Sequence, residues 1–219
     1  MRSERAPGRA VLLAALLSAG LMALPAGAQE STADLPPESI VTLPVIRSDV
    51  VFRIPRGFLV RPGVVDRKPT SYQAIFYPLG HTTDNWSERL RLLVVRGHLK
   101  DTATPAQALL DTLISQSRAA CLSDMSVIPE ATTTPARAAA LWICKGSAEQ
   151  KRNTLSGYYH VALGEDDSYI LMREQRIAST AASLLPSEEE VHKWKKDTDT
   201  LNICPLGGAP CGPLGEVPR

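Results

Sequence analysis

Apolar residues recur at helical spacing between Thr104 and Cys121, and this is the clearest local pattern in the chain. Thr104 is a capping residue, Pro105 stands at the first helical position, and Gln107 follows three residues after the cap, a combination that favours a helix start. The pattern predicts an amphipathic helix that ends near Cys121, with this cysteine on the buried side of its last turn. The predicted apolar stripe consists of Ala106, Leu109, Leu110, Leu113, Ile114, Ala120 and Cys121.

Short β-prone runs that end at glycine or proline account for most of the remaining apolar residues. Residues 45–46 and 50–54 are predicted to form one extended segment at the start of the domain. Separate strands are predicted at 58–60, 71–77, 125–128, 138–144, 157–163 and 168–177. The last two runs form a hairpin whose acidic tip contains Gly164. The run 86–95 alternates charged and apolar residues and is predicted as a strand, with a short helix capped at Asp84-Asn85 as the alternative.

A second helix is predicted to begin at Pro186-Ser187. Acidic residues occupy its first turn and lysines follow, as the helix dipole favours, while Val191 and Trp194 give it a thin apolar face. The order of strands, helix, strands and helix, with hairpin links, predicts the α+β class. We expect an antiparallel β-sheet covered by two helices within a single domain.

The first 28 residues have the three parts of a signal peptide. Arg2, Arg5 and Arg9 precede an apolar run over 10–24, and Ala26-Gly27-Ala28 supplies a small-residue cleavage site. This run of 15 residues is short for a membrane span, which needs roughly 20. We expect cleavage near Ala28, a periplasmic or secreted location, and no membrane span.

Polar and proline-containing segments flank the predicted domain. Residues 29–44 are predicted to be a flexible linker, and residues 205–219 a tail rich in proline and glycine. The segment between them, 45–204, is of a comfortable size for one domain with its own core.

The charge balance argues against nucleic acid as a partner. The full chain has 24 basic and 23 acidic residues, and loss of the signal peptide would leave 21 and 22. A nucleic-acid-binding protein normally has a basic surplus or stripe, and neither is present in this sequence.

Four cysteines form an even set in a chain that is predicted to be exported, and oxidising conditions favour their pairing. Of the three possible connectivities we predict Cys121 with Cys144 and Cys204 with Cys211. This choice closes the shortest loops and fastens the helix to the strand that follows it. The alternative, a reactive or catalytic thiol, would need an unpaired cysteine, and full pairing leaves none over.

Three side chains are candidates for binding: Trp86, His98 and His160. An aromatic residue at a strand entry can anchor a ligand or partner, although the favoured interpretation makes Trp86 a core tryptophan. His98 and His160 lie in or beside predicted strands, and the simpler interpretation makes them ordinary sheet-surface residues. The histidine spacings match no metal motif, so no metal site is predicted.

Motifs for catalysis or cofactor binding are missing from the sequence. There is no nucleophile elbow, phosphate-binding glycine loop or dinucleotide fingerprint, so we predict no catalytic residue and no cofactor.

The segments from Tyr77 to Gly80 and from Asn85 to Leu90, followed by a helix and a spaced cysteine pair, resemble those of uncharacterised exported proteobacterial proteins. The order of strands and helices is similar to that of small antiparallel α/β/α sandwiches of the PsbP and Mog-like kind. This resemblance covers about residues 50–204 and transfers no functional residue. It implies an accessory or binding role rather than catalysis.

The sequence thus favours an exported accessory or binding module that presents one face of its sheet to a protein or a small molecule. The alternative hypothesis is an exported hydrolase whose site is assembled from residues far apart in the sequence.

Overall fold

The computed structural model describes residues 35–96, 106–131, 134–146, 153–178 and 185–206, all within one compact unit. In this part of the chain there are ten strands and two helices. In chain order they are β1 (Ser39–Val45), β2 (Ser48–Ile54), β3 (Val64–Lys68), β4 (Ser71–Phe76), β5 (Glu88–Arg96), α1 (Ala106–Ala119), β6 (Met125–Pro129), β7 (Arg137–Cys144), β8 (Thr154–Leu163), β9 (Asp167–Ile177), α2 (Glu188–Thr198) and β10 (Asn202–Pro205).

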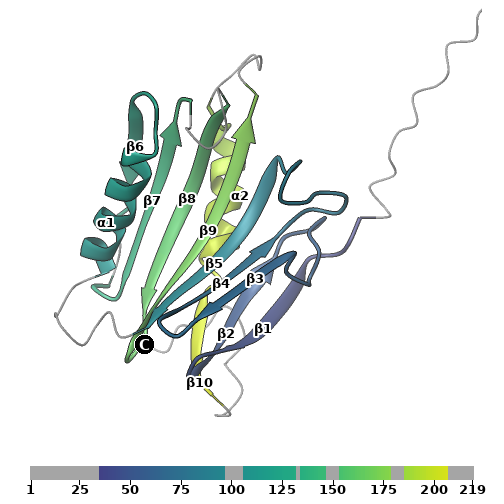
Figure 1. The fold of residues 1–219 in the computed structure, drawn as a ribbon, viewed down its shortest axis with the longest axis vertical. Coiled ribbons are helices and arrows are strands. Elements are labelled where there is room, and N and C mark those ends of the chain that lie inside the picture. The colour runs from purple at the N-terminus through teal and green to yellow at the C-terminus, as the bar shows by residue number, and fades with distance from the viewer. Residues whose placement is uncertain (1–34, 97–105, 132–133, 147–152, 179–184, 207–219) are drawn as a thin grey trace, which may run out of the picture. The chain divides into compact units, whose positions relative to one another are not determined.

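The strands form two antiparallel sheets. Seven strands pair in the order β3-β4-β5-β9-β8-β7-β6, so that β3 and β6 are the two edges (Figure 1). The other three pair in the order β1-β2-β10. The hairpins β3–β4, β6–β7 and β8–β9 join neighbours along the sequence, as the antiparallel class requires. The predicted α+β fold is confirmed, with a second, smaller sheet added to it.

Helix α1 covers one face of the seven-stranded sheet, which we call the α1 face. Its buried Leu109, Leu110 and Ile114 pack in one apolar cluster with Ala138, Ala140 and Trp142 of β7. Because side chains alternate along a strand, these β7 residues all point to the same side. The predicted amphipathic helix is therefore confirmed over Ala106–Ala119, and its apolar stripe contacts β7, whereas Ala120 of the predicted stripe is exposed.

The opposite face, which we call the α2 face, is covered by two elements. The three-stranded sheet packs on β4, β5 and β9, with Phe52 and Phe76 in edge-to-face contact at 5.6 Å between ring centroids. Beside it, α2 buries Trp194 against Leu141, Ile143 and Tyr158. The two helices thus lie on opposite sides of the seven-stranded sheet (Figure 1).

Helix α2 begins where the sequence predicts. Ser187 is its N-cap, accepting a hydrogen bond from the Glu190 amide, while the Glu190 carboxylate accepts one from the Ser187 amide. This reciprocal capping box uses two early amides that have no partner inside the helix. The Ser187 amide is also the main cause that holds the pKa of Glu190 below its ordinary value.

Several boundaries differ from the sequence prediction. β1 takes in residues 39–44 of the segment predicted as a linker, because pairing with β2 satisfies their backbone. The predicted tail begins one residue early, since β10 extends to Pro205. The predicted strand 58–60 is reduced to a single bridge between Phe58 and Pro78, and the exposed strand β3 was not predicted.

The ambiguous run 86–95 is resolved in favour of a strand. β5 pairs with β4 and β9 on its two sides, so the alternative of a helix capped at Asp84-Asn85 is wrong. None of the helices in the described part of the chain is long and apolar enough to span a membrane.

Gly157 in β8 leaves room for the Trp142 indole to lie across the sheet. A Cβ at this position would stand 2.8 Å from the Arg173 carbonyl oxygen and 2.9 Å from the indole carbons Cε2 and Cζ2. We expect Gly157→Ala to lower the free energy of unfolding by about 1–3 kcal/mol, because the added methyl overfills a packed site. Urea unfolding measures this loss.

The matched control for Gly157→Ala is the neighbouring Ser156→Ala. The Ser156 hydroxyl is buried and makes no hydrogen bond, so its removal should leave stability unchanged or slightly higher. Equal losses in the two variants would show that β8 tolerates no change at all, and would contradict a specific role for Gly157.

Candidate functional site

Trp86 lies inside the protein rather than on a binding surface. Its side chain is 2% exposed, and the guanidinium carbons of Arg89 and Arg176 lie 4.1 and 4.3 Å from its ring centroid. Cations at this distance are attracted to the negative face of the indole. The structure therefore favours the interpretation of Trp86 as a core tryptophan, and it offers no open surface for an anchoring role.

A buried carboxylate on the α1 face organises the charges around Trp86. Glu174 of β9 accepts hydrogen bonds from Arg89 Nε at 2.7 Å and from Arg91 Nη2 at 3.3 Å. Strand register explains this grouping, because Arg89 pairs with Glu174 and Arg91 pairs with Met172, the next position on the same face. Burial by itself raises the pKa of Glu174, but the two guanidinium groups outweigh it and hold the pKa below its ordinary value. Glu174 is thus ionised at neutral pH.

His160 is buried between two charged side chains rather than on a sheet surface. Its Nε2 lies 3.2 Å from Arg137 Nη1, and its Nδ1 lies 3.0 Å from Asp199 Oδ1. A guanidinium can only donate, so in this arrangement Nε2 accepts from Arg137 and Nδ1 donates to Asp199. Arg137 also donates to the carbonyl oxygen of Leu201. This network joins β7 and β8 to the end of α2.

The histidine network gives the hydrolase alternative no support. A general base needs its second imidazole nitrogen to face a nucleophile or water, with the carboxylate on the other side. Here a guanidinium occupies that second position. His98 lies outside the described residues, so its predicted binding role stays a prediction. No group of three or more metal-binding side chains occurs in the part of the chain that the structure describes.

An apolar groove opens on the α2 face at the β6 edge of the seven-stranded sheet. It has a volume of about 450 Å³. Leu141 and Ile143 of β7 lie beneath it, and Ile128 of β6 and Leu185 line it while remaining 56% and 55% exposed. We call this feature the α2–β6 groove. The full lining comprises Ile128, Glu130, Leu141, Ile143, Leu185, Pro186, Glu188, Val191, His192 and Lys195.

The groove exists because the second layer is narrower than the sheet. Helix α2 packs mainly on β8, β9 and β2, and its Trp194 reaches Leu141 and Ile143 of β7, whereas Ile128 of β6 does not belong to this cluster. Met125 and Val127 point to the other side and pack in the α1 cluster, which leaves Ile128 facing outward. Alternation along β6 thus places Ile128 on the α2 face, where it stays 56% exposed.

Glu130 holds one side of the α2–β6 groove in a fixed position. It accepts a hydrogen bond from the Tyr158 hydroxyl at 2.5 Å and one from Lys195 Nζ at 2.8 Å. Burial is the largest of the causes that raise the pKa of Tyr158, so its hydroxyl stays protonated and donates. The hydrogen bond from Lys195 ties α2 to the residue that follows β6.

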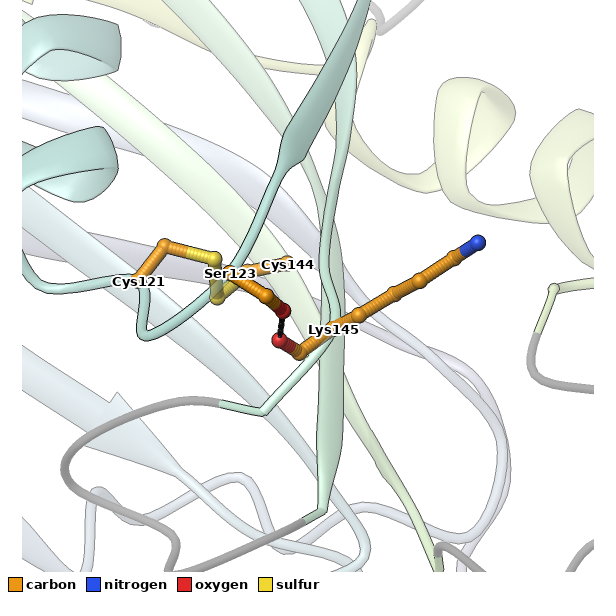
Figure 2. Close-up of a disulfide and its surroundings, with 4 residues drawn as sticks. All are labelled: Cys121, Ser123, Cys144 and Lys145. Carbon is orange, nitrogen blue, oxygen red and sulfur yellow. Dashed lines mark hydrogen bonds between the residues drawn. A yellow bond between two sulfur atoms is a disulfide. The ribbon is translucent and has the colours of Figure 1, made fainter.

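The disulfide between Cys121 and Cys144 is present as predicted, with 5.7 Å between the two Cα atoms. Cys121 follows the end of α1, and Cys144 is the last residue of β7. The Ser123 hydroxyl donates to the Lys145 carbonyl oxygen next to this bond (Figure 2). The Leu122 amide also donates to the Gly146 carbonyl oxygen. The turn after α1 is therefore fastened to the end of β7 at three points.

Cys204 is also disulfide-bonded. Its predicted partner, Cys211, lies outside the described residues, so that pairing stays a prediction. Non-reducing peptide mapping is the direct measurement.

Sequence patterns did not identify the residues that form the Glu174 ion pairs or those that form the α2–β6 groove. Arg89 and Arg91 alternate with apolar residues in β5, a signal that identified the strand but gave no information about Glu174, 85 positions away from Arg89. Ile128, Leu141 and Ile143 are apolar residues that are indistinguishable from core positions until the covering layer is known.

No protein-family model and no curated protein sequence matches the chain. Among solved structures, the crystal structure of the Ran-binding protein Mog1p of Saccharomyces cerevisiae is similar, with a TM-score of 0.56 and 9% sequence identity. The similarity covers 78% of this chain and 98% of Mog1p. The predicted likeness to Mog-like sandwiches is confirmed for the fold alone, and the resemblance to exported proteobacterial proteins stays a prediction.

Proposed function

We propose that the protein is an exported binding module that docks a partner protein in the α2–β6 groove. The observation that carries this proposal is the apolar lining of the groove, where Ile128 and Leu185 remain more than half exposed. Contiguous apolar surface of this kind, rimmed by polar side chains, marks interaction sites on soluble proteins. The apparent signal peptide and the disulfide between Cys121 and Cys144 support the exported part of the proposal.

The occupant that fits best is an amphipathic helix lying beside α2. The wall that α2 contributes consists of Glu188, Val191, His192 and Lys195, which recur at helical spacing over two turns. A helix with apolar residues at spacings of three and four would cover Ile128 and Leu141 and extend the layer that α2 begins.

Addition of a strand to β6 fits less well. The Glu130 amide donates to the Ala139 carbonyl oxygen of β7. Hydrogen-bonded and non-hydrogen-bonded pairs alternate in an antiparallel ladder, so the backbone nitrogen of Pro129 faces away from β7, toward the open edge where a new strand would pair. Proline has no amide hydrogen, and it is a common means of blunting a sheet edge. The fold analogy is consistent with a protein partner, because the structurally similar Mog1p is a Ran-binding protein.

Site-specific photo-crosslinking in the encoding organism tests the proposal. A photoreactive amino acid replaces Ile128 in the groove, and in a matched variant it replaces Ile40 of β1, which is 61% exposed. We expect one discrete adduct with a second protein from position 128 and none from position 40. The intact mass of the adduct should also show removal of the first 28 residues.

The position of the crosslink on the partner identifies the type of element that is bound. Adducts at partner residues spaced by three or four fit a helix, whereas a spacing of two would show strand addition. Equal labelling from positions 40 and 128, or an adduct of twice the mass of this chain, would contradict docking of a partner protein in the groove. A mass that retains residues 1–28 would contradict export by signal-peptide cleavage.

A further inference from the structure

The α2–β6 groove has a definite direction, which the contacts between α2 and the sheet establish. Gln175 Nε2 of β9 donates a hydrogen bond to Glu190 Oε1, in the first turn of α2, at 3.0 Å. Strand register places Gln175 in one cross-strand row with Ser156, Ile143 and Ser126. The start of α2 is therefore held level with Ser126 of β6.

The later turns of α2 lie level with the other end of β6. Lys195 Nζ donates to Glu130 Oε1 at 2.8 Å, and Glu130 follows Pro129, the last residue of β6. Helix α2 and strand β6 thus run in the same direction along the two sides of the groove. We call the two ends of the groove the Ser126 end and the Glu130 end.

The charges at the Glu130 end balance each other. Glu130 and Lys195 form an ion pair, with side chains that are 25% and 44% exposed. The second oxygen of the Glu130 carboxylate accepts from the Tyr158 hydroxyl. This pair therefore contributes no net charge to the groove.

The Ser126 end carries a negative charge. Glu188 lines the groove, is exposed, and forms no ion pair within the described residues. The other acidic residues of the first turn do not line the groove, because Glu190 caps the helix and Glu189 lies outside the lining. Lys145, just beyond the end of β7, is exposed and makes no ion pair with Glu188. The groove is thus polarised, with its carboxylate at the start of α2.

We propose that the helix bound in the α2–β6 groove runs antiparallel to α2 and places a lysine or arginine of its last turn beside Glu188. This arrangement rests on the docking of a helix proposed above, and adds the direction and the charge of that helix. The dipole of a helix favours cations in its last turn, so an antiparallel partner supplies a cation where the groove carries its carboxylate. The dipoles of the two helices also oppose each other.

A parallel partner would bring like charges together. Its first turn, where the dipole favours acidic residues, would lie beside Glu188. Like charges that face each other across an interface weaken binding and act against the wrong partner. Glu188 is therefore a specificity-determining residue, while Ile128 and Leu141 supply apolar area in either direction.

Photo-crosslinking from two positions on β6 tests the direction. The full chain is expressed in the encoding organism with the photoreactive amino acid at Ile128 or at Ser126, which is exposed and lies two residues nearer the start of α2. Two strand residues span about 6.6 Å and a helix rises about 1.5 Å per residue, so the two sets of adducts should be about four partner residues apart. We expect the adducts from Ser126 to lie nearer the partner's C-terminus.

Substitutions in the first turn of α2 test the charge, with the photoreactive amino acid at Ile128 throughout. Glu188→Gln should lower the adduct yield by about threefold, because an exposed ion pair contributes modestly, and Glu188→Lys by about tenfold or more, because like charges repel. The matched controls Glu189→Gln and Glu189→Lys make the same changes outside the lining and should leave the yield unchanged. Both positions lie in the first turn, so effects on the stability of α2 cancel in the comparison.

An exchange of charges identifies the partner residue. Replacing the partner's cation nearest the Ser126 adduct with glutamate should restore most of the yield that Glu188→Lys loses. Adducts in the reverse order, an acidic partner segment at the Ser126 end, or equal losses from changes at 188 and 189 would each overturn the proposal while leaving docking in the groove intact. The absence of any adduct from Ile128, or a strand-like spacing of two, would instead contradict the docking of a helix itself.

Discussion

Replacing Glu174 with glutamine should lower the free energy of unfolding by about 3 kcal/mol or more, the largest effect that we expect from a single uncharged replacement. The carboxylate is 3% exposed and is the shared acceptor for Arg89 and Arg91. Glutamine keeps the shape of the side chain but removes the negative charge that both guanidinium groups contact. Urea unfolding at neutral pH measures the loss.

The pH dependence gives this prediction a second readout. The folded-state pKa of Glu174 lies below its ordinary value of 4.5, so the folded chain resists protonation more than the unfolded chain does. The stabilisation is then fully present above pH 4.5 and is lost as the pH falls through the lower, folded-state value. The difference in stability between the native protein and Glu174→Gln should shrink over the same range.

Asp66→Asn is the matched control for Glu174→Gln. Asp66 pairs with Lys68 at 3.2 Å, but both side chains are at least half exposed, so this change should cost less than about 0.5 kcal/mol. A Glu174→Gln variant as stable as Asp66→Asn would show that the buried ion pairs contribute nothing net to the fold.

Removing the disulfide by the double change Cys121→Ala and Cys144→Ala should destabilise the protein by roughly 3.4 kcal/mol, the value that the loop-closure model gives for this sequence separation of 23. The bond restricts the unfolded chain and holds the end of α1 on β7. Comparing the midpoints and slopes of urea unfolding for the oxidised protein and the variant measures the effect.

Ser123→Ala separates the disulfide from its surroundings. The Ser123 hydroxyl hydrogen bond to the Lys145 carbonyl lies beside the disulfide at an exposed position (Figure 2), so its loss should cost about 1 kcal/mol or less. If the double cysteine variant loses no more than Ser123→Ala, the cross-link is not a main source of stability.

Local sequence determined the elements whose signals lie within a few residues of each other. The spacing of Leu109, Leu110 and Ile114 identified α1, and the acidic first turn identified the start of α2. The cysteine pairing between 121 and 144 also followed from the sequence, because a short loop and one helix–strand unit left few geometric choices. These features depend on periodicity, capping and loop length, all of which can be read along the chain.

Other elements were missed because their stability comes from contacts between distant segments. Ser39–Val45 contains two polar residues and a proline, and it becomes a strand only by pairing with β2. Val64–Lys68 is mostly polar and exposed, and it is held by β4 at the edge of the sheet. Propensity is a weak guide where a neighbouring strand satisfies the backbone.

Both candidate sites were decided by tertiary structure. Glu174 reaches Arg89 and Arg91 through the register of β5 and β9, and Gly157 matters only because Trp142 lies over it. Ile128 stays 56% exposed because, within the described residues, α2 packs mainly on β8 rather than on β6. The sequence by itself determined the helices, most of the strands and one cross-link, since these depend on near neighbours. The charge cluster and the groove depend on strand register and on how far one layer covers another, and these arise only when the sheets are assembled.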